Sequence, residues 1–149
     1  MTPLDLQDCL EKEIGDVLSK VLIKNDDTFH LYTQNLPSKK DAKDYSMFPY
    51  VLIKLGDGED NLDAATQDVV MVFATRDTDQ NYQGYRDVMN AIQKVREYLK
   101  KTQEVGERYT VKYPIRWAAP DDSSTYPFYF GAILVTFNIP QIGLENENL

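Results

Sequence analysis

Apolar side chains recur at helical spacing in two long segments of the chain. From Pro3 to Lys24 this stripe consists of Leu6, Leu10, Ile14, Val17, Leu18, Val21 and Leu22. From Tyr82 to Thr102 it consists of Tyr85, Val88, Met89, Ile92, Val95 and Leu99. Thr2 is suited to cap the first helix, because its hydroxyl oxygen can accept a bond from a free backbone amide. The pattern therefore predicts two amphipathic helices.

Four other segments carry the pattern of β-strands. Two of these segments are Tyr50–Leu55 and Tyr109–Trp117, and the segment Tyr109–Trp117 alternates apolar with polar residues. Pro114 cannot donate a hydrogen bond to a neighbouring strand, so we expect the second of these at a sheet edge. Thr66–Thr75 and Phe128–Ile139 are apolar on both faces. We therefore expect these two strands at the centre of the sheet, covered on both sides.

The order of these segments predicts an α+β fold. We expect a mainly antiparallel sheet of four to five strands with two helices, in the order α-β-β-α-β-β, built from two hairpins joined by the second helix. A weaker alternation over Phe29–Gln34 indicates an extra short strand. One face of the sheet packs on the second helix. The other face needs a cover, which either the first helix or a neighbouring subunit can provide.

Length and composition indicate one soluble domain. The 149 residues fit a single domain over residues 1–140, followed by an acidic tail over residues 141–149. No apolar run approaches the ~20 residues that span a bilayer, and the acidic start of the chain does not resemble a secretory signal. Cys9 is the only cysteine, which fits a reducing cytoplasm.

The net charge of −8 argues against binding to DNA or RNA by neutralisation of phosphates. Two interpretations of this acidic character stay open. It can serve solubility alone, or it can belong to a surface that lies near DNA without gripping it.

No arrangement of residues predicts a catalytic or metal site. The acidic residues between Gly56 and Asp63 do not have the spacing of a calcium loop. The run Asp77–Asn81 comes closer, but Tyr82 stands where such a loop needs glycine. His30 is the single histidine and has no nucleophile pattern beside it. We therefore expect no enzymatic activity, no metal and no cofactor.

Four segments together resemble a known family. They are Tyr50–Gly58, Asp68–Thr75, Gly84–Ile92 and Pro127–Phe137. In these strand and helix patterns and their spacing, the chain resembles the tail terminator (tail completion) proteins of long-tailed bacteriophages and prophages. The likeness runs from about Leu4 to Pro140 and leaves Thr28–Phe48 unmatched.

The resemblance implies a structural protein of the virion. Such proteins form a ring, usually of six subunits, that caps the tail tube, stops its polymerisation and joins it to the head connector. The implied partners are copies of the chain itself, the tail tube protein and the head-completion or connector protein. DNA would pass through the lumen without specific binding, and no membrane is involved. The protein would lie at the head-proximal end of the tail, after assembly in the host cytoplasm.

Two other interpretations stay open: a different head–tail joining or minor tail protein of the same layered fold, and a ligand-binding domain unrelated to phages.

Within a ring, polar loops are the candidates for contact with a neighbour, the lumen or the tube. The candidate residues are Asp57, Glu59, Asp60, Asp63, Asp77, Asp79, Asp121, Asp122, Lys39 and Lys40. The last two belong to the polar segment Pro37–Asp44, which we expect to be mobile or bound to a partner.

Overall fold

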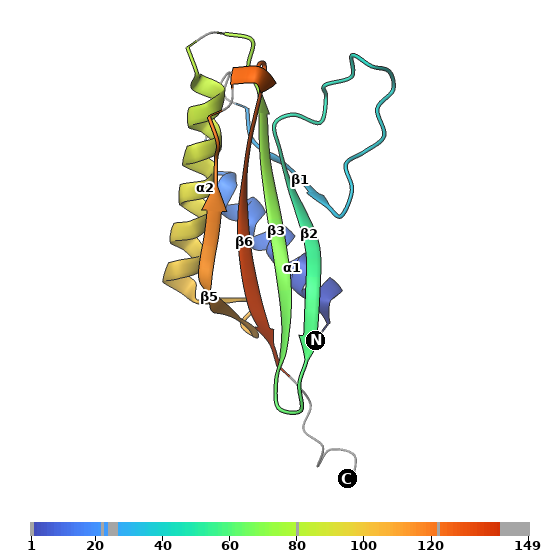
Figure 1. Ribbon diagram of the computed structural model, residues 1–149, viewed down its shortest axis with the longest axis vertical. Helices are drawn as coiled ribbons and strands as arrows, with labels where there is room; N and C mark the ends of the chain where they lie inside the picture. The colour runs from blue at the N-terminus through green and yellow to red at the C-terminus, as the bar shows by residue number, and fades with distance from the viewer. Residues whose placement is uncertain (1, 22, 24–26, 80, 122, 141–149) are drawn as a thin grey trace.

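A six-stranded mixed sheet carries two helices on one of its faces (Figure 1). This arrangement comes from a computed structural model, which describes residues 2–21, 23, 27–79, 81–121 and 123–140. The elements in chain order are α1 (Pro3–Leu18), β1 (His30–Thr33), β2 (Tyr50–Asp60), β3 (Ala65–Arg76), α2 (Gln83–Thr102), β4 (Glu104–Val105), β5 (Tyr109–Ala118), a short 3₁₀ helix (Ser123–Thr125) and β6 (Phe128–Ile139).

The strands lie in the order β1-β2-β3-β6-β5-β4. The two strands with two apolar faces, β3 and β6, are adjacent and central, as predicted, and Val69 lies opposite Val135 in their register. The predicted α+β class with two helices is confirmed, and the extra short strand expected near Phe29 is present as β1, but the sheet is mixed and has six strands rather than four to five. Strand β1 pairs with β2 in parallel, and β4 adds a two-residue strand beyond β5. Strand β4 covers only Tyr109 and Thr110 of β5, so the part of β5 that contains Pro114 lies at the edge of the sheet, as expected.

The first helix is shorter than predicted. Helix α1 begins after Thr2, whose Oγ1 accepts a 3.0 Å hydrogen bond from the amide of Asp5, but it ends at Leu18. The predicted end at Lys24 lies outside the described residues. Helix α2 agrees with its prediction to within one residue at its start and ends at Thr102 as expected.

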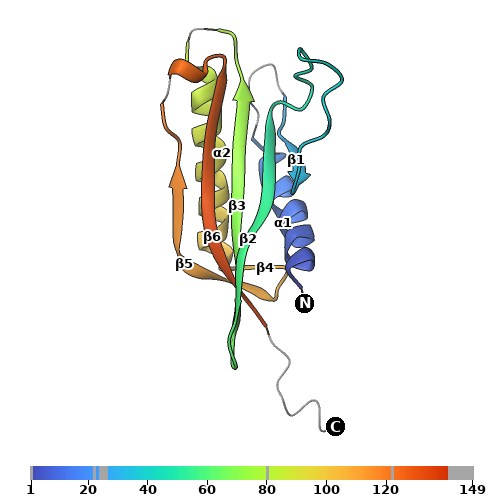
Figure 2. The same ribbon diagram turned by 45° about the vertical axis from the view of Figure 1, so that its right-hand side comes forward.

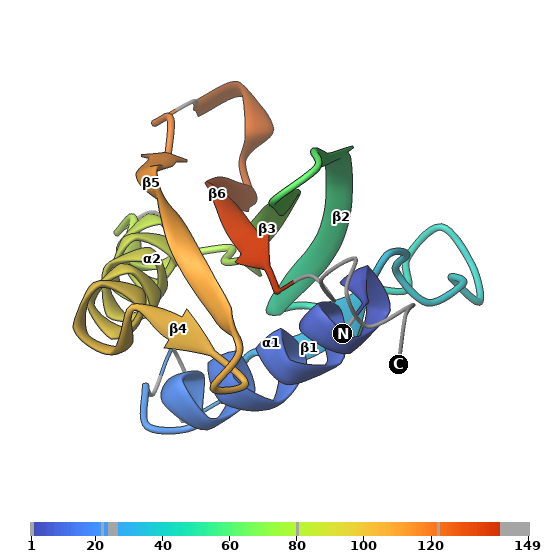
Figure 3. The same cartoon turned by 90° about the horizontal axis from the view of Figure 1, so that it is seen from below.

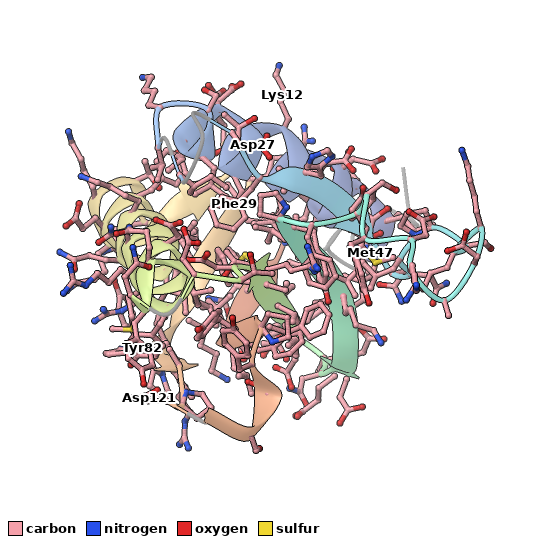
Figure 4. The ribbon with its side chains drawn as sticks, turned by 90° about the horizontal axis from the view of Figure 1, so that it is seen from above. Lys12, Asp27, Phe29, Met47, Tyr82 and Asp121 are labelled. Carbon is pink, nitrogen blue, oxygen red and sulfur yellow. The ribbon has the colours of Figure 1, made fainter. Side chains whose placement is uncertain are left out.

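Both helices pack on the same face of the sheet (Figure 3). Helix α2 lies against β3 and β6, and α1 lies beside α2 and against β2. Phe29, just before β1, packs edge-to-face on Phe73 at 6.5 Å and points into this layer (Figure 4). The largest fully buried side chains of the core are Tyr109, Phe73, Phe137, Leu6, Leu10, Ile14, Leu18, Ile53, Met71, Ile92, Leu99 and Ile133.

Hydrogen bonds fix α1 at both ends of the layer. Buried Gln7 donates from Nε2 to Oε1 of Gln34 at 2.7 Å and to the carbonyl of Ile53 at 2.9 Å. Further along the helix, the carboxylate of Glu13 accepts a 2.5 Å bond from the hydroxyl group of Tyr98 and a 2.6 Å bond from the amide of Gly106. These contacts hold α1 against β2 through Gln7 and beside α2 through Glu13, so α1 cannot cover the opposite face of the sheet.

Candidate functional site: the open face of the sheet

Among the residues that the structure describes, the face of the sheet away from the helices is covered only at one end. There the segment of residues 34–49 lays Met47 against Tyr50, Leu52 and Ala74 (Figure 4). Over the rest of the face, Phe130 keeps 39% and Leu134 46% of its surface exposed. The expectation that β3 and β6 are covered on both sides is therefore met only in part by this chain.

The exposed apolar residues form one continuous strip, because their positions are paired across the two central strands. Val70 lies opposite Leu134, Val72 opposite Ala132 and Ala74 opposite Phe130. We call the surface formed by Val70, Val72, Phe130, Ala132 and Leu134 the open sheet face.

A depression of about 380 Å³ hollows one end of the open sheet face. It lies between two irregularities of the sheet, where the register shifts between Leu55 and Gly58 on β2 and between Lys112 and Arg116 on β5. We call this depression the trough. Its lining residues are Gly56, Asp57, Asp68, Val69, Val70, Pro114, Arg116, Leu134, Val135 and Thr136.

Charged side chains of both signs lie around the trough, and three of those nearby are basic. Lys54, Lys112 and Arg116 pair with Val70, Thr136 and Leu134 respectively, so all three stand on the open side of the sheet. All three are exposed. Two acidic side chains, Asp57 and Asp68, also line the trough, and Asp68 accepts a 2.6 Å hydrogen bond from the hydroxyl group of Thr136. The trough thus combines an apolar floor with a rim of mixed charge, because Asp57 and Asp68 line it together with Arg116.

The predicted acidic loop between β2 and β3 is instead a long hairpin. Strands β2 and β3 continue to Asp60 and Ala65, and the amide of Asn61 donates a 2.7 Å bond to the carbonyl of Ala64 to close the turn. The hairpin projects beyond the helices at one end of the molecule (Figure 2). Leu62 at its tip is 78% exposed. The predicted residues Asp57, Glu59, Asp60 and Asp63 all lie on this hairpin and are exposed.

The hairpin stays extended because a buried side chain supports its irregular register. Gln67 on β3 is only 6% exposed, and its Nε2 donates to the carbonyls of Gly56 and Asp68, both at 2.9 Å. These bonds satisfy backbone groups at the shift between Leu55 and Gly58. The acidic residues are therefore held on a firm arm of the sheet.

The other predicted acidic positions lie at the opposite end of the molecule (Figure 1). Asp77 is only 3% exposed, and its carboxylate accepts bonds from the amides of Gly84 and Asp79 in the same chain. It therefore serves α2 and does not present its side chain outward, whereas Asp79 and Asp121 are exposed. Asp122 lies outside the described residues.

Aromatic and acidic groups meet at this same end. Burial raises the pKa of Tyr129, and the negative charges of Asp77 and Asp121 add to the effect. Tyr82, which is 53% exposed, and Asp121 are both labelled in Figure 4.

Lys39 and Lys40 lie exposed in the segment of residues 34–49, which folds back on itself. Lys39 donates to the carbonyl of Ala42 at 3.3 Å, and the amide of Lys40 donates to Asp44 at 3.0 Å. Hydrogen bonds from Ser46 and the amide of Lys40 lower the pKa of Asp44 to about 2. This segment is built around local turns, and it places the two lysines away from the hairpin (Figure 1).

The sequence interpretation missed Lys54, Lys112 and Arg116. Each occupies a polar position on a strand, and such positions normally face water. The residues that pair with them on β3 and β6 are mostly apolar, so these charges lie beside an apolar strip. The sequence could have indicated this only if the register between the strands had been known.

Within the described part of the chain, no group of three or more His, Cys, Asp or Glu residues lies close enough together to hold a metal ion. Among the described helices, none has the length and apolar character needed to cross a membrane. Cys9 is half-buried, and burial raises the pKa of its thiol, which disfavours the reactive thiolate.

These features define an α+β domain with an open, partly apolar sheet face and a projecting acidic hairpin. Comparison of the sequence with known protein families and with curated proteins finds no match.

Proposed function

We propose that this chain is a structural subunit of a phage tail, of the tail terminator type. Copies of it would form a ring that caps the tail tube, stops its polymerisation and joins it to the head connector. The protein would act without catalysis, at the head-proximal end of the tail. DNA would pass through the ring without specific binding.

The observation that carries this proposal is the open sheet face. Contiguous apolar surface on a soluble domain marks a site of protein–protein contact. Here it lies on the two central strands, with Phe130 and Leu134 both more than one third exposed. A partner is therefore expected to complete the second layer of this sheet.

The sequence likeness falls on the elements that build this surface. Asp68–Thr75 lies within β3 and Pro127–Phe137 covers most of β6. The other two matching segments belong to β2 and to helix α2. The net charge of −8 also supports a role near DNA that does not hold its backbone.

The test uses a phage or prophage in which the gene for this chain is deleted. The expected result is tails of irregular length that do not join to heads, visible by electron microscopy. Complementation with the unaltered gene should restore both length and joining, whereas Leu134→Asp should not. Leu4→Asp is the matched control, because Leu4 is 64% exposed on α1 and far from the open sheet face.

Two results would contradict the proposal. Tails of normal length with a defect only in joining to heads would indicate a different joining protein. Normal, complete virions without the gene product would remove the chain from tail assembly altogether.

A further inference from the structure

We propose that a basic groove between α2 and β5 takes the acidic hairpin tip of a second copy of this chain. The groove is a depression of about 440 Å³ where α2 runs beside the edge part of β5 (Figure 1), and it is lined by Arg96, Lys100, Tyr113, Pro114 and Ile115. The hairpin tip comprises residues Glu59–Asp63, with Leu62 at its apex. This inference rests on the proposed function, since it names a contact that would hold the ring together.

The groove carries positive charge that its own chain does not neutralise. Among the described residues, those that line it include two cations and no acid. Neither Arg96 nor Lys100 forms an ion pair within the described part of the chain. The carboxylate of Glu97, the nearest acid along α2, lies 3.8 Å from the ammonium group of Lys94 instead. The groove is therefore positive, in contrast to the trough, whose rim carries both signs of charge.

Neighbouring side chains hold the groove in shape. The guanidinium group of Arg96 lies 4.3 Å from the ring centroid of Trp117, and Nε2 of Gln103 donates a 2.8 Å hydrogen bond to the hydroxyl oxygen of Tyr113. Trp117 keeps 41% and Tyr113 50% of its surface exposed. Tryptophan, tyrosine and arginine are the side chains that contribute most to binding at protein–protein interfaces. The groove thus presents a cationic part and an aromatic part that are already ordered in the single chain.

The hairpin tip has the matching composition. Asp60 and Asp63 flank Leu62, and all three side chains are exposed, Leu62 by 78%. No basic residue occurs between Gly56 and Gln67, so the tip presents negative charge alone. Its leucine can bury apolar surface against the floor of the groove while its carboxylates meet the two cations. Opposite charges on facing surfaces also favour the correct encounter and disfavour others.

The tip that enters the groove has to come from another copy. The hairpin continues β2 and β3 beyond the helices at one end of the molecule (Figure 2), whereas the groove lies along the flank of α2. Gln67 ties the base of the hairpin with two hydrogen bonds of 2.9 Å, so the arm stays extended. Contacts between two different surfaces are heterologous, and they form rings when the rotation between copies closes.

A second copy fits the groove better than a nucleic acid does. Binding through phosphates gains affinity from each cation that is engaged, and the groove is lined by only two among the described residues. The net charge of −8 repels a phosphate backbone at longer range. Pro114 and Ile115 in the groove make no favourable contact with a phosphate, whereas a leucine side chain can pack against them.

The first test uses the fluorescence of Trp117, the only tryptophan of the chain. Its ring contacts Arg96 at the groove, so a seated hairpin tip should shield it from water. We expect its emission to shift to shorter wavelength, and its quenching by acrylamide to fall, as the wild-type protein is concentrated. Leu62→Ser should abolish this dependence on concentration. Leu4→Ser is the matched control and should keep it, because Leu4 is an equally exposed leucine on α1.

The second test exchanges the charges of the two surfaces. One variant carries Asp60→Lys with Asp63→Lys, and another carries Arg96→Glu with Lys100→Glu. Each alone should weaken self-association by about tenfold or more in analytical ultracentrifugation, because two surfaces of like charge then meet. An equimolar mixture should regain association, since the unaltered tip of one variant meets the unaltered groove of the other and the two altered surfaces are again opposite in charge.

A matched control separates this contact from a general effect of net charge. Lys12→Glu with Lys20→Glu makes the same change of net charge as the groove variant, at exposed positions away from the groove, and should associate like the wild type. Circular dichroism checks that every variant is folded. Lys100→Glu alone replaces the double groove variant if that variant is unstable.

Four results would overturn the inference. They are wild-type emission that does not depend on concentration, charge variants that associate like the wild type, a mixture that stays as weak as its components, and a control that loses association as the groove variant does. Trp117 that responds to a single-stranded DNA oligonucleotide but not to protein concentration would assign the groove to phosphates and would overturn the inference as well.

The two proposals can fail separately. If deletion of the gene disturbs tail length while neither the fluorescence nor the charge exchange reports association, the tail function stands and this contact is wrong. If both report association but deletion leaves virions normal, the contact between copies stands and the tail function is wrong.

Discussion

The buried carboxylate of Asp77 accepts a hydrogen bond of 2.9 Å from the backbone amide of Gly84. This bond joins the end of β3 to the first turn of α2. The residue at the usual capping position, Tyr82, has φ 61° and makes no side-chain hydrogen bond to the helix. Asp77 therefore supplies, from a distance in sequence, the negative charge and the acceptor that a helix N-terminus favours.

We predict that Asp77→Ala lowers the free energy of unfolding by about 1–2 kcal/mol, because an amide of α2 loses its acceptor. Urea denaturation followed by circular dichroism measures the change. Asp63→Ala, on the exposed hairpin, is the matched control and should have little effect. Equal midpoints for the two variants would mean that Asp77 does not cap the helix.

Gln7 makes the second structural contact that can be tested. We predict that Gln7→Leu costs about 1–3 kcal/mol, because Oε1 of Gln34 and the carbonyl of Ile53 lose a buried donor. Faster hydrogen exchange is expected at the amide of Leu55, which donates to the same Oε1 of Gln34 at 2.7 Å. Exchange unchanged at Leu55, together with unchanged stability, would contradict this role.

Tyr98 predicts a dependence of stability on alkaline pH. Burial and the hydrogen bond to Glu13 raise its pKa to about 12 in the folded protein, above the ordinary value of 10.0. The folded state thus favours the neutral phenol. The resulting stability is fully present below the unfolded pKa and is lost as the pH rises from about 10 towards 12.

The expected result is that the stability difference between the wild type and Tyr98→Phe changes across this alkaline range in favour of the phenylalanine variant. Thermal unfolding at a series of pH values measures it. Glu13→Gln should make the change smaller, since it removes the charge that opposes ionisation of Tyr98. A constant difference between wild type and Tyr98→Phe would show that the contact does not bias ionisation.

Charge reversal at Glu59 and Asp60 should leave the fold intact. Both residues are exposed on the hairpin, so the combined change to lysine should alter the free energy of unfolding by no more than about 0.5 kcal/mol. Denaturation monitored by circular dichroism checks this. Unfolding of the variant would mean that these charges belong to the structure of the hairpin, and that their assignment as a contact surface is wrong.

The candidate residues show where sequence reasoning was sufficient. The acids of the predicted loop Gly56–Asp63 are exposed, as polar, turn-rich segments usually are. Three of them, Asp57, Glu59 and Asp60, nevertheless lie on strand β2 and not in a loop. Asp77 was grouped with them, although it is buried. Its role depends on the amide of Gly84, and a pattern of loop residues does not reveal which acid lies near the start of a helix in space.

The sequence by itself determined the local elements. The spacing of apolar residues located both helices, and the two-sided apolar pattern of Asp68–Thr75 and Phe128–Ile139 placed those strands at the centre of the sheet. These features follow from periodicity, which each segment carries alone. Thr2 as the cap of α1 is a further case, because its hydroxyl group acts on an amide only three residues away.

Only the tertiary structure decided how these elements combine. It placed α1 against β2 through Gln7 and beside α2 through Glu13, paired β1 in parallel with β2, and left the open sheet face without a helix among the described residues. It also extended the hairpin to Asp60 and brought Arg116 beside Leu134. Each of these outcomes depends on contacts between segments that lie far apart in the sequence. The hydrophobic pattern of a single segment is compatible with several such arrangements, so it cannot select among them.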